Sequence, residues 1–279
     1  MISLPANYKT RIAKQFSRAA HTYNTAADVQ LDIAFDGLNL LPNINGLGLD
    51  IGCGTGRISQ QLAKKCNKLF AMDLAFGMLE YAQKNNATDD DLARRQFIHW
   101  LQGDAEHLPL SNESIDLVFS SMALQWCKDE TKVLSEISRV MKPKATAILA
   151  IMCAGSFYEL NDSWLEIDEQ RHTNDFKTAD NWRQAAAEQG LLVSVNNKQY
   201  VTWHQNVRQL LGSIKSIGAN VVLSLNSERV APNKSTHKIN KPLSRDTIRN
   251  LEVTYKHKYS KNSQLPLTYE VCFLQCIKP

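Results

Sequence analysis

Between positions 46 and 152 the chain alternates short apolar runs with segments of helical periodicity. Each run is five to eight residues long, the usual length of a strand. The runs are LGLDI (47–51), KLFAMD (68–73), FIHWLQGD (97–104), IDLVFSS (115–121) and ATAILAIM (145–152). Because such alternation is typical of repeated βαβ units, it predicts an α/β fold with a parallel sheet.

Helical periodicity precedes this alternation and returns after it. Between positions 7 and 41, apolar side chains such as Ile12 and Phe16 recur at spacings of three and four residues, which indicates amphipathic helix. After Gly155 the pattern predicts further helices and two longer strands. The helices are expected at 161–170, 181–190, 207–217 and 244–259, and the strands at 191–203 and 265–277.

Together these elements predict one domain over residues 1–279. Its expected parts are an N-terminal helical cap (1–44), a core (45–153) and a C-terminal part (154–279), which carries a helical insertion at about 205–262. The sheet would have seven strands, mostly parallel, with helices on both faces. The polar stretch 220–242 is long enough to form a lid or an irregular loop.

Composition narrows the class of protein without assigning a function. Hydrophobic residues make up 43% of the chain and charged residues 22%, as in ordinary soluble proteins. The longest apolar run, 145–154, has about half of the roughly 20 residues that a membrane helix needs, and the N-terminus lacks an apolar signal core. We therefore expect a cytoplasmic protein that does not contact the membrane.

The cysteine spacing and the net charge argue against two further classes of protein, metalloproteins and nucleic-acid-binding proteins. The six cysteines show no metal-ligand spacing, which favours free thiols and no metal site. A net charge of +4 is too small to indicate nucleic-acid binding.

The stretch GLGLDIGCGTGRISQQL (46–62) is rich in glycine and joins a predicted strand to a predicted helix. Backbone N–H groups in such a loop face whatever binds at the carboxyl end of the strand. Gly52, Gly54 and Gly56 give G-x-G-x-G. A dinucleotide fingerprint needs another small residue at position 57, where this chain has Arg57, so nicotinamide binding is disfavoured.

With Asp50 before the glycines, this loop resembles motif I of the class I S-adenosylmethionine (SAM)-dependent methyltransferases. The resemblance implies a Rossmann-like fold and SAM as the cofactor. It places Asp50 near the ammonium of the cofactor, Asp73 on the ribose and Asp104 on the adenine. The implied cofactor-binding set is Asp50, Gly52, Gly54, Gly56, Asp73, Leu74, Met78, Asp104, Ala105, Ser121 and Met122.

Further motifs extend the resemblance over nearly the whole chain. They are FSRAAHTYNTAADVQ (16–30), GDAEHLPL (103–110), SSMALQWC (120–127), GSFYELNDSW (155–164), SIKSIGAN (213–220) and LPLTYEV (265–271). In these segments the chain is similar to the malonyl-acyl carrier protein O-methyltransferases of biotin synthesis. It departs from them at Lys144 and Ala145, where that family usually has a glycine pair, at Ala75, and after position 220, where a glycine-rich continuation is missing.

This resemblance implies methylation of the free carboxylate of a malonyl thioester, carried on acyl carrier protein or on coenzyme A. A carboxylate of this kind is ionised at neutral pH, so the reaction needs no general base. Tyr23 is the candidate catalytic residue. The candidate substrate-binding residues are Arg18, His21, Gln125 and Trp126. Tyr23 and Trp126 could instead be core aromatic residues, Arg18 could form a surface ion pair, and His21 could be structural or exposed.

Positive charge is concentrated between positions 229 and 262. Nine lysines and arginines stand there against two acids, Asp246 and Glu252. Because carrier proteins are acidic as a family, this stretch is a candidate docking surface, although a solvated face is the simpler alternative. The basic residues are Arg229, Lys234, Lys238, Lys241, Arg245, Arg249, Lys256, Lys258 and Lys261.

Three other functions stay open at this stage. SAM could methylate a different small acceptor, such as a quinone precursor. The chain could instead be an assembly factor similar to a respiratory complex I assembly protein thought to hydroxylate an arginine, or a scaffold that binds the cofactor without catalysis. The intact glycines and Asp73 weigh against an inactive site.

Overall fold

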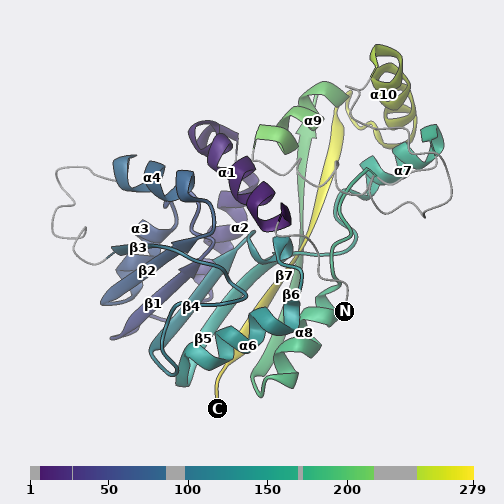
Figure 1. Cartoon of the computed structure of the whole chain (residues 1–279). Helices are drawn as coiled ribbons and strands as arrows, with labels where there is room; N and C mark the ends of the chain where they lie inside the picture. The colour runs from purple at the N-terminus through teal and green to yellow at the C-terminus, as the bar shows by residue number, and fades with distance from the viewer. Residues whose placement is uncertain (1–6, 27, 86–97, 169–171, 217–243) are drawn as a thin grey trace.

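A seven-stranded sheet lies at the centre of the computed structural model (Figure 1). The structure describes residues 7–26, 28–85, 98–168, 172–216 and 244–279. The strand order is β3-β2-β1-β4-β5-β7-β6. The strands are β1 (Leu47–Ile51), β2 (Lys68–Asp73), β3 (Ile98–Gln102), β4 (Ile115–Ser121), β5 (Met141–Met152), β6 (Leu192–His204) and β7 (Leu265–Ile277).

The sheet is mixed. Strands β1 to β5 pair in parallel, whereas β7 is antiparallel to both β5 and β6. The chain reverses its order across the sheet at β1, which lies between β2 and β4. Open α/β sheets bind ligands outside the carboxyl ends of the strands at such a switch point. The glycine loop that follows β1 is therefore placed for binding.

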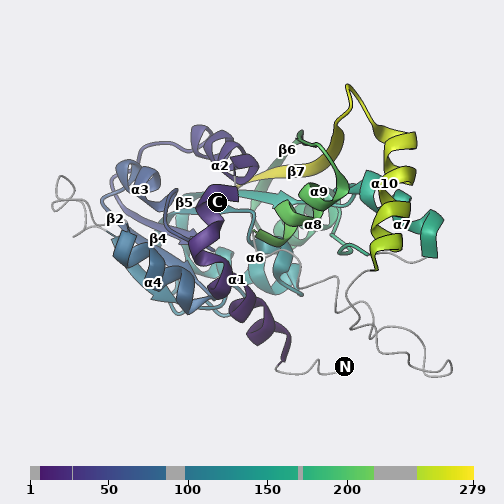
Figure 2. The same cartoon turned by 90° about the horizontal axis from the view of Figure 1, so that it is seen from above.

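Helices cover both faces of the sheet (Figure 2). On one face α2 and α3 pack on residues of β2, β4 and β5, including Leu69, Leu117 and Phe119. On the other face α6 and α8 pack on a core that contains Leu49, Val118 and the buried Trp182. The helices are α1 (Asn7–Ala26), α2 (Asp28–Asn39), α3 (Ser59–Leu62), α4 (Phe76–Asn85), α6 (Glu130–Val140), α7 (Tyr158–Asp168), α8 (Ala179–Glu188), α9 (Val207–Ser216) and α10 (Arg245–Tyr259).

A second core joins the upper parts of β6 and β7 to α7, α9 and α10 (Figure 1). Trp164, Leu251 and Tyr255 are fully buried in it, and the Tyr255 hydroxyl donates a hydrogen bond to the Pro266 carbonyl at 2.6 Å. Helix α10 begins as its sequence predicts, because the Ser244 side chain accepts a hydrogen bond from the Thr247 N–H.

Some boundaries differ from the predictions. The helical stretch 7–41 forms two helices, α1 and α2, and β5 begins at Met141 rather than at 145. Within β5, Lys144 has a φ of 68°, a left-handed conformation that glycine adopts more easily. A glycine, which the family resemblance leads us to expect at this position, would adopt this conformation without strain. No helix in the described part of the chain is long and apolar enough to cross a membrane.

Two of the sequence-based expectations stay predictions. The segment 220–242 lies outside the described residues. The predicted division of the chain into a cap, a core and a C-terminal part also stays a prediction. One continuous sheet contains strands from both the core and the C-terminal part, so the strand pairing does not separate them.

Candidate active site

The glycine loop leaves β1 through three left-handed residues. Gly52, Gly54 and Gly56 have φ angles of 76°, 55° and 78°, which side-chain-bearing residues rarely adopt. A Cβ atom on Gly52 would lie 2.2 Å from the Cβ of Ala123, in the turn after β4. Gly52 is therefore required both for its backbone conformation and for the close approach of the two turns.

Asp73 ends β2 beside this loop. Its carboxylate accepts hydrogen bonds from the N–H groups of Gly54 (2.9 Å) and Ala75 (2.7 Å). Each oxygen keeps further acceptor capacity, since a carboxylate offers about four lone-pair sites. Burial raises the pKa of Asp73, while the backbone donors oppose that shift. Asp73 thus braces the loop and can still accept hydrogen bonds from a ligand.

Asp50 is a buried carboxylate on β1, with 2% of its surface exposed. One oxygen accepts a hydrogen bond from the Ser59 hydroxyl at 2.6 Å. Burial raises the pKa of Asp50 to about 7, and the negative charge of Asp73 contributes to the shift. A cation bound nearby would restore the ionised form.

A large cavity of about 800 Å³, including space open to solvent, lies over the carboxyl ends of β1, β2 and β4. Most of the residues predicted from the sequence to bind the cofactor line this cavity. These are Gly52, Gly54, Asp73, Leu74, Met78, Asp104, Ala105, Ser121 and Met122.

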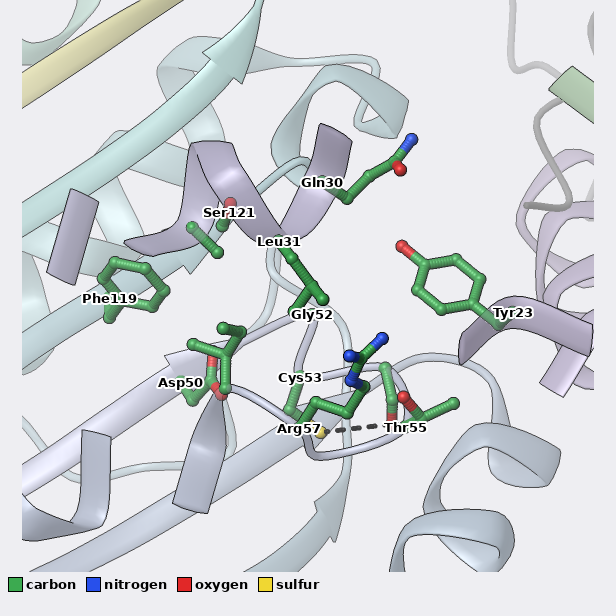
Figure 3. A pocket seen from close by; sticks show the side chains of 13 residues that line it. Tyr23, Gln30, Leu31, Asp50, Gly52, Cys53, Thr55, Arg57, Phe119 and Ser121 are labelled. Carbon is green, nitrogen blue, oxygen red and sulfur yellow. Dashed lines mark hydrogen bonds between the residues drawn. The ribbon is translucent and has the colours of Figure 1, made fainter. Parts of the chain in front are cut away.

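A small cavity of about 500 Å³, including space open to solvent, lies beside the glycine loop (Figure 3). Asp50 lines it, together with Gln30 from α2 and Arg57 from the loop. The two cavities adjoin, because Tyr23 and Ser121 line both. Gly56 lines neither cavity, and its N–H closes the turn on the Cys53 carbonyl at 3.0 Å.

Three buried polar atoms at or near the cavities have no hydrogen-bond partner among the described residues. They are Gln30 Oε1, Ser121 Oγ and Gln125 Oε1. Buried polar groups in proteins are nearly always paired, so orphaned atoms beside a cavity point to a polar ligand. The sequence analysis did not predict Gln30 as a site residue. The available signal was a polar residue within the otherwise apolar stripe of Val29, Ile33 and Ala34.

Tyr23 stands where the two cavities meet. Burial and the charge of Asp73 raise the pKa of its hydroxyl to about 12, so the phenol stays protonated. Trp126 lines the large cavity, where its ring packs edge-on against Phe16 at 5.6 Å between centroids. Both side chains line the large cavity, and their roles toward an acceptor stay predictions.

The other three candidate substrate residues do not line either cavity. Arg18 and His21 are exposed on α1, and the His21 ring packs against Tyr81 of α4. They lie five and two residues before Tyr23, on another face of the helix. The Gln125 amide group donates to the Met122 carbonyl at 2.7 Å, which fixes the turn after β4.

Asp104 has a partner that the sequence did not indicate. Lys9 of α1 forms ion pairs with Asp104 (2.5 Å) and Glu106 (2.6 Å) at the edge of the large cavity. The other Asp104 oxygen accepts from the Glu106 N–H at 3.0 Å. The pair joins residues 95 positions apart, and no local pattern predicts such a contact.

Comparisons with known proteins decide the family. A methyltransferase domain model matches residues 49–149, the segment from β1 to β5. The chain is 37% identical over 212 residues to a malonyl-[acyl-carrier protein] O-methyltransferase of Yersinia pestis, covering 76% of this chain and 75% of that protein. This chain belongs to the malonyl-[acyl-carrier protein] O-methyltransferase family.

Other relatives of this methyltransferase agree. The Serratia marcescens protein of the same name is 35% identical, over 76% of this chain and 79% of its own length. The biotin biosynthesis bifunctional protein BioHC of Cellvibrio japonicus is 30% identical over 97% of this chain, which spans half of that longer protein.

Solved structures show the fold of this methyltransferase. A Haemonchus contortus phosphoethanolamine N-methyltransferase, solved with S-adenosylhomocysteine, aligns with a TM-score of 0.58 at 18% identity, covering 99% of this chain and 61% of that chain. The YcgJ protein of Bacillus subtilis gives 0.57 at 15% identity, covering 88% and 97%. At such low identity these likenesses concern architecture alone, and the architecture is the Rossmann-like class I methyltransferase fold.

Proposed function

We propose that this protein methylates the free carboxylate of a malonyl thioester held on acyl carrier protein, with SAM as the methyl donor. One observation carries the proposal. In a chain of this family, the glycine loop, Asp50 and Asp73 surround two adjoining cavities at the switch point of the sheet.

The residues present fit SAM. The large cavity offers Asp73, Leu74, Met78 and Asp104 for the adenosine half. The small cavity offers a carboxylate, Asp50, for the ammonium, and the guanidinium of Arg57 for the carboxylate of the amino-acid half. Polar atoms of Gln30 and Ser121 that lack a hydrogen-bond partner among the described residues belong to side chains that line the small cavity.

When bound, SAM would supply a methyl group carried on a positively charged sulfur; transfer of this methyl group to a carboxylate oxygen displaces a neutral thioether, S-adenosylhomocysteine, and needs no proton transfer. The task of the protein is therefore to orient the acceptor and to exclude water. Tyr23, protonated at all physiological pH values, can donate a hydrogen bond to the acceptor carboxylate without removing its charge. Phe16 and Trp126 give the large cavity an apolar wall, and orientation alone can contribute about 7–11 kcal/mol to such a reaction.

The test is methyl-ester formation by the purified protein with SAM and either malonyl-acyl carrier protein or malonyl-coenzyme A, followed by mass spectrometry. We expect product with the wild type and a loss of at least about 100-fold with Gly52→Ala, since the added methyl group collides with Ala123 and strains the loop. The matched control is Gly212→Ala, where a Cβ meets nothing within 4 Å.

The outcome separates this function from its alternatives. Cofactor binding without any transfer to a malonyl thioester would favour a non-catalytic scaffold. Transfer to a quinone precursor, but to neither malonyl thioester, would move the protein to small-molecule methylation. Growth of a biotin auxotroph that lacks its own malonyl methyltransferase, with Asp50→Ala as the negative control, tests the same proposal in cells.

A further inference from the structure

A surface groove between α9 and α10 is lined mainly by cations. It encloses about 560 Å³, including space open to solvent. The lining residues are Arg208 from α9, and Arg245, Ile248, Arg249, Glu252, Val253 and Lys256 from α10. We call this surface the arginine groove.

The charges in the arginine groove are largely uncompensated. Its only carboxylate, Glu252, accepts a hydrogen bond from Lys256 at 2.6 Å. In the part of the chain that the structure describes, no ion pair or hydrogen bond joins the side chains of Arg208, Arg245 and Arg249 to another residue. Lys258, on the same helix, differs because Asp162 (2.7 Å) and Glu166 (2.5 Å) neutralise it.

The structure therefore changes which basic residues belong to the candidate docking surface that the sequence suggested. Arg208 joins the groove from outside that stretch, while Lys258 is paired elsewhere. Lys261 does not line the groove. Four of the remaining basic residues, Arg229, Lys234, Lys238 and Lys241, lie outside the described residues.

The two arginines at the start of α10 do not stabilise this helix. Arg245 is the first residue of the helix, where the helix dipole disfavours a positive charge. Arg249 follows one turn later on the same face, and like charges at this spacing repel each other. Positions that oppose the local rules of helix stability are expected to be functional.

Apolar side chains lie among these cations. Val253 is 63% exposed, and Ile248 is partly exposed beside it. A surface that combines unpaired cations with exposed aliphatic groups is complementary to an acidic face with apolar residues between its carboxylates.

The arginine groove is connected to the candidate active site through α9. Figure 2 shows α9 between α1 and α10. Helices α1 and α9 pack against each other, and the Thr22 hydroxyl of α1, which donates to the Ala19 carbonyl at 3.1 Å, lies 3.4 Å from the Ser216 carbonyl of α9. Tyr23, next to Thr22, lines both cavities, so a partner on the groove lies one helix away from the wall of the site.

We propose that the arginine groove is the docking surface for the acidic carrier protein that brings the malonyl thioester, an inference that rests on the function proposed above. The groove steers and orients the carrier, whereas the cavities bind the cofactor and the acceptor group. Charged docking of this kind affects association most and weakens with salt.

The experiment measures the dissociation constant of malonyl-acyl carrier protein by surface plasmon resonance at low and high salt. We expect Arg245→Glu/Arg249→Glu to weaken binding by about tenfold or more at low salt, and Arg208→Glu, from the other helix, to weaken it as well. The control is Lys64→Glu/Lys68→Glu. It makes the same change in net charge at exposed positions where β2 begins, at the opposite end of the strands from the site. Melting temperature and S-adenosylhomocysteine binding verify that each variant is folded.

Two results would overturn the docking proposal. In one, the groove variants bind the carrier as tightly as the wild type. In the other, the control pair weakens binding equally, which makes the effect one of net charge alone. If the wild type methylates malonyl-N-acetylcysteamine, which has no protein or phosphate, yet does not bind the carrier, docking fails, whereas methylation of the malonyl carboxylate stands for a thioester that is not held on the carrier. If it methylates no malonyl thioester, the proposed function itself fails.

Discussion

At the scale of single residues, the candidate site holds a carboxylate in a place that disfavours its charge. Among the residues that the structure describes, the Ser59 hydroxyl is the only side-chain donor to Asp50, and burial of this carboxylate opposes its ionisation. A buried carboxylate without a cationic partner lowers stability. Its retention beside the glycine loop is understandable if a ligand ammonium supplies the missing positive charge.

This arrangement predicts how stability depends on pH. The pKa of Asp50 is about 7 in the folded protein, whereas an unfolded aspartate titrates near pH 4. The folded state binds this proton more tightly, so the stability that Asp50 contributes is fully present below about pH 4 and is lost as the pH rises to about 7. Asp50→Asn removes that dependence. We expect the variant to exceed the wild type in unfolding free energy by on the order of 1–3 kcal/mol at about pH 8, and to match it near pH 4.

Urea unfolding of both proteins across this pH range checks the prediction. Binding of S-adenosylhomocysteine, which has the same ammonium as SAM, should be weaker in Asp50→Asn at pH 8. A stability difference that is constant with pH would contradict the burial argument for Asp50.

At the scale of elements, α1 closes the large cavity through contacts at both of its halves. Near its start, Lys9 pairs with Asp104 and Glu106. Further along, the Ser17 hydroxyl accepts a hydrogen bond from the Gly77 N–H at 3.1 Å, and a Cβ on Gly77 would lie 2.7 Å from that of Ser17. Helix α1 is thus held against α4 and against the loop after β3, with Tyr23 between the cavities.

Removing the Lys9 ion pairs tests this role of α1. Lys9→Met keeps the aliphatic stem and leaves Asp104 and Glu106 without their cation. Because the pairs are partly exposed, we expect a loss of about 0.5–1.5 kcal/mol in unfolding free energy. Calorimetry should also show S-adenosylhomocysteine binding several-fold more weakly, since Asp104 is no longer held in position. Lys14→Met, at an exposed position of the same helix, is the control, and equal effects of the two substitutions would refute the role of Lys9.

The sequence predicted elements better than contacts between elements. The ranges of β1, β2, β4 and β7 follow from local alternation, and the glycine spacing identified the loop without any tertiary information. The break between α1 and α2 was missed because apolar periodicity continues across it. The Lys9–Asp104 pair and the position of Arg208 in the arginine groove depend on how distant segments pack, which local patterns do not encode.

The orientation of side chains on α1 shows the same limit. Arg18, His21 and Tyr23 are close in sequence, and all three were plausible near the acceptor. A helix turns by about 100° per residue, so only a subset can face a given cavity. Packing of α1 against α4 and α9 selects Tyr23 for the interior and leaves Arg18 and His21 exposed.

At the scale of the whole molecule, the two cavities are lined by residues of α1, α2 and α4 and by the loops that follow β1, β2, β3 and β4. A ligand that fills them would link the N-terminal helices to the sheet. Binding to the folded state alone stabilises a protein by about 2.7 kcal/mol when the ligand is at 100 times its dissociation constant. We expect S-adenosylhomocysteine to raise the melting temperature by several degrees, and Gly52→Ala to abolish the shift. An unchanged melting temperature of the wild type would contradict the cofactor assignment.

The placement of β7 between β5 and β6 constrains the order of assembly. Strand β6 comes before β7 in the chain, but its neighbour in the sheet is β7 and not the earlier strand β5. The pairing runs from His204 opposite Leu265 to Leu192 opposite Ile277. During synthesis on the ribosome, β5 would therefore present an open edge, and β6 would have no place in the sheet, until residues 265–277 emerge. An exposed strand edge is prone to pairing with other chains. The protein would depend on its last strand to protect the nascent chain from aggregation.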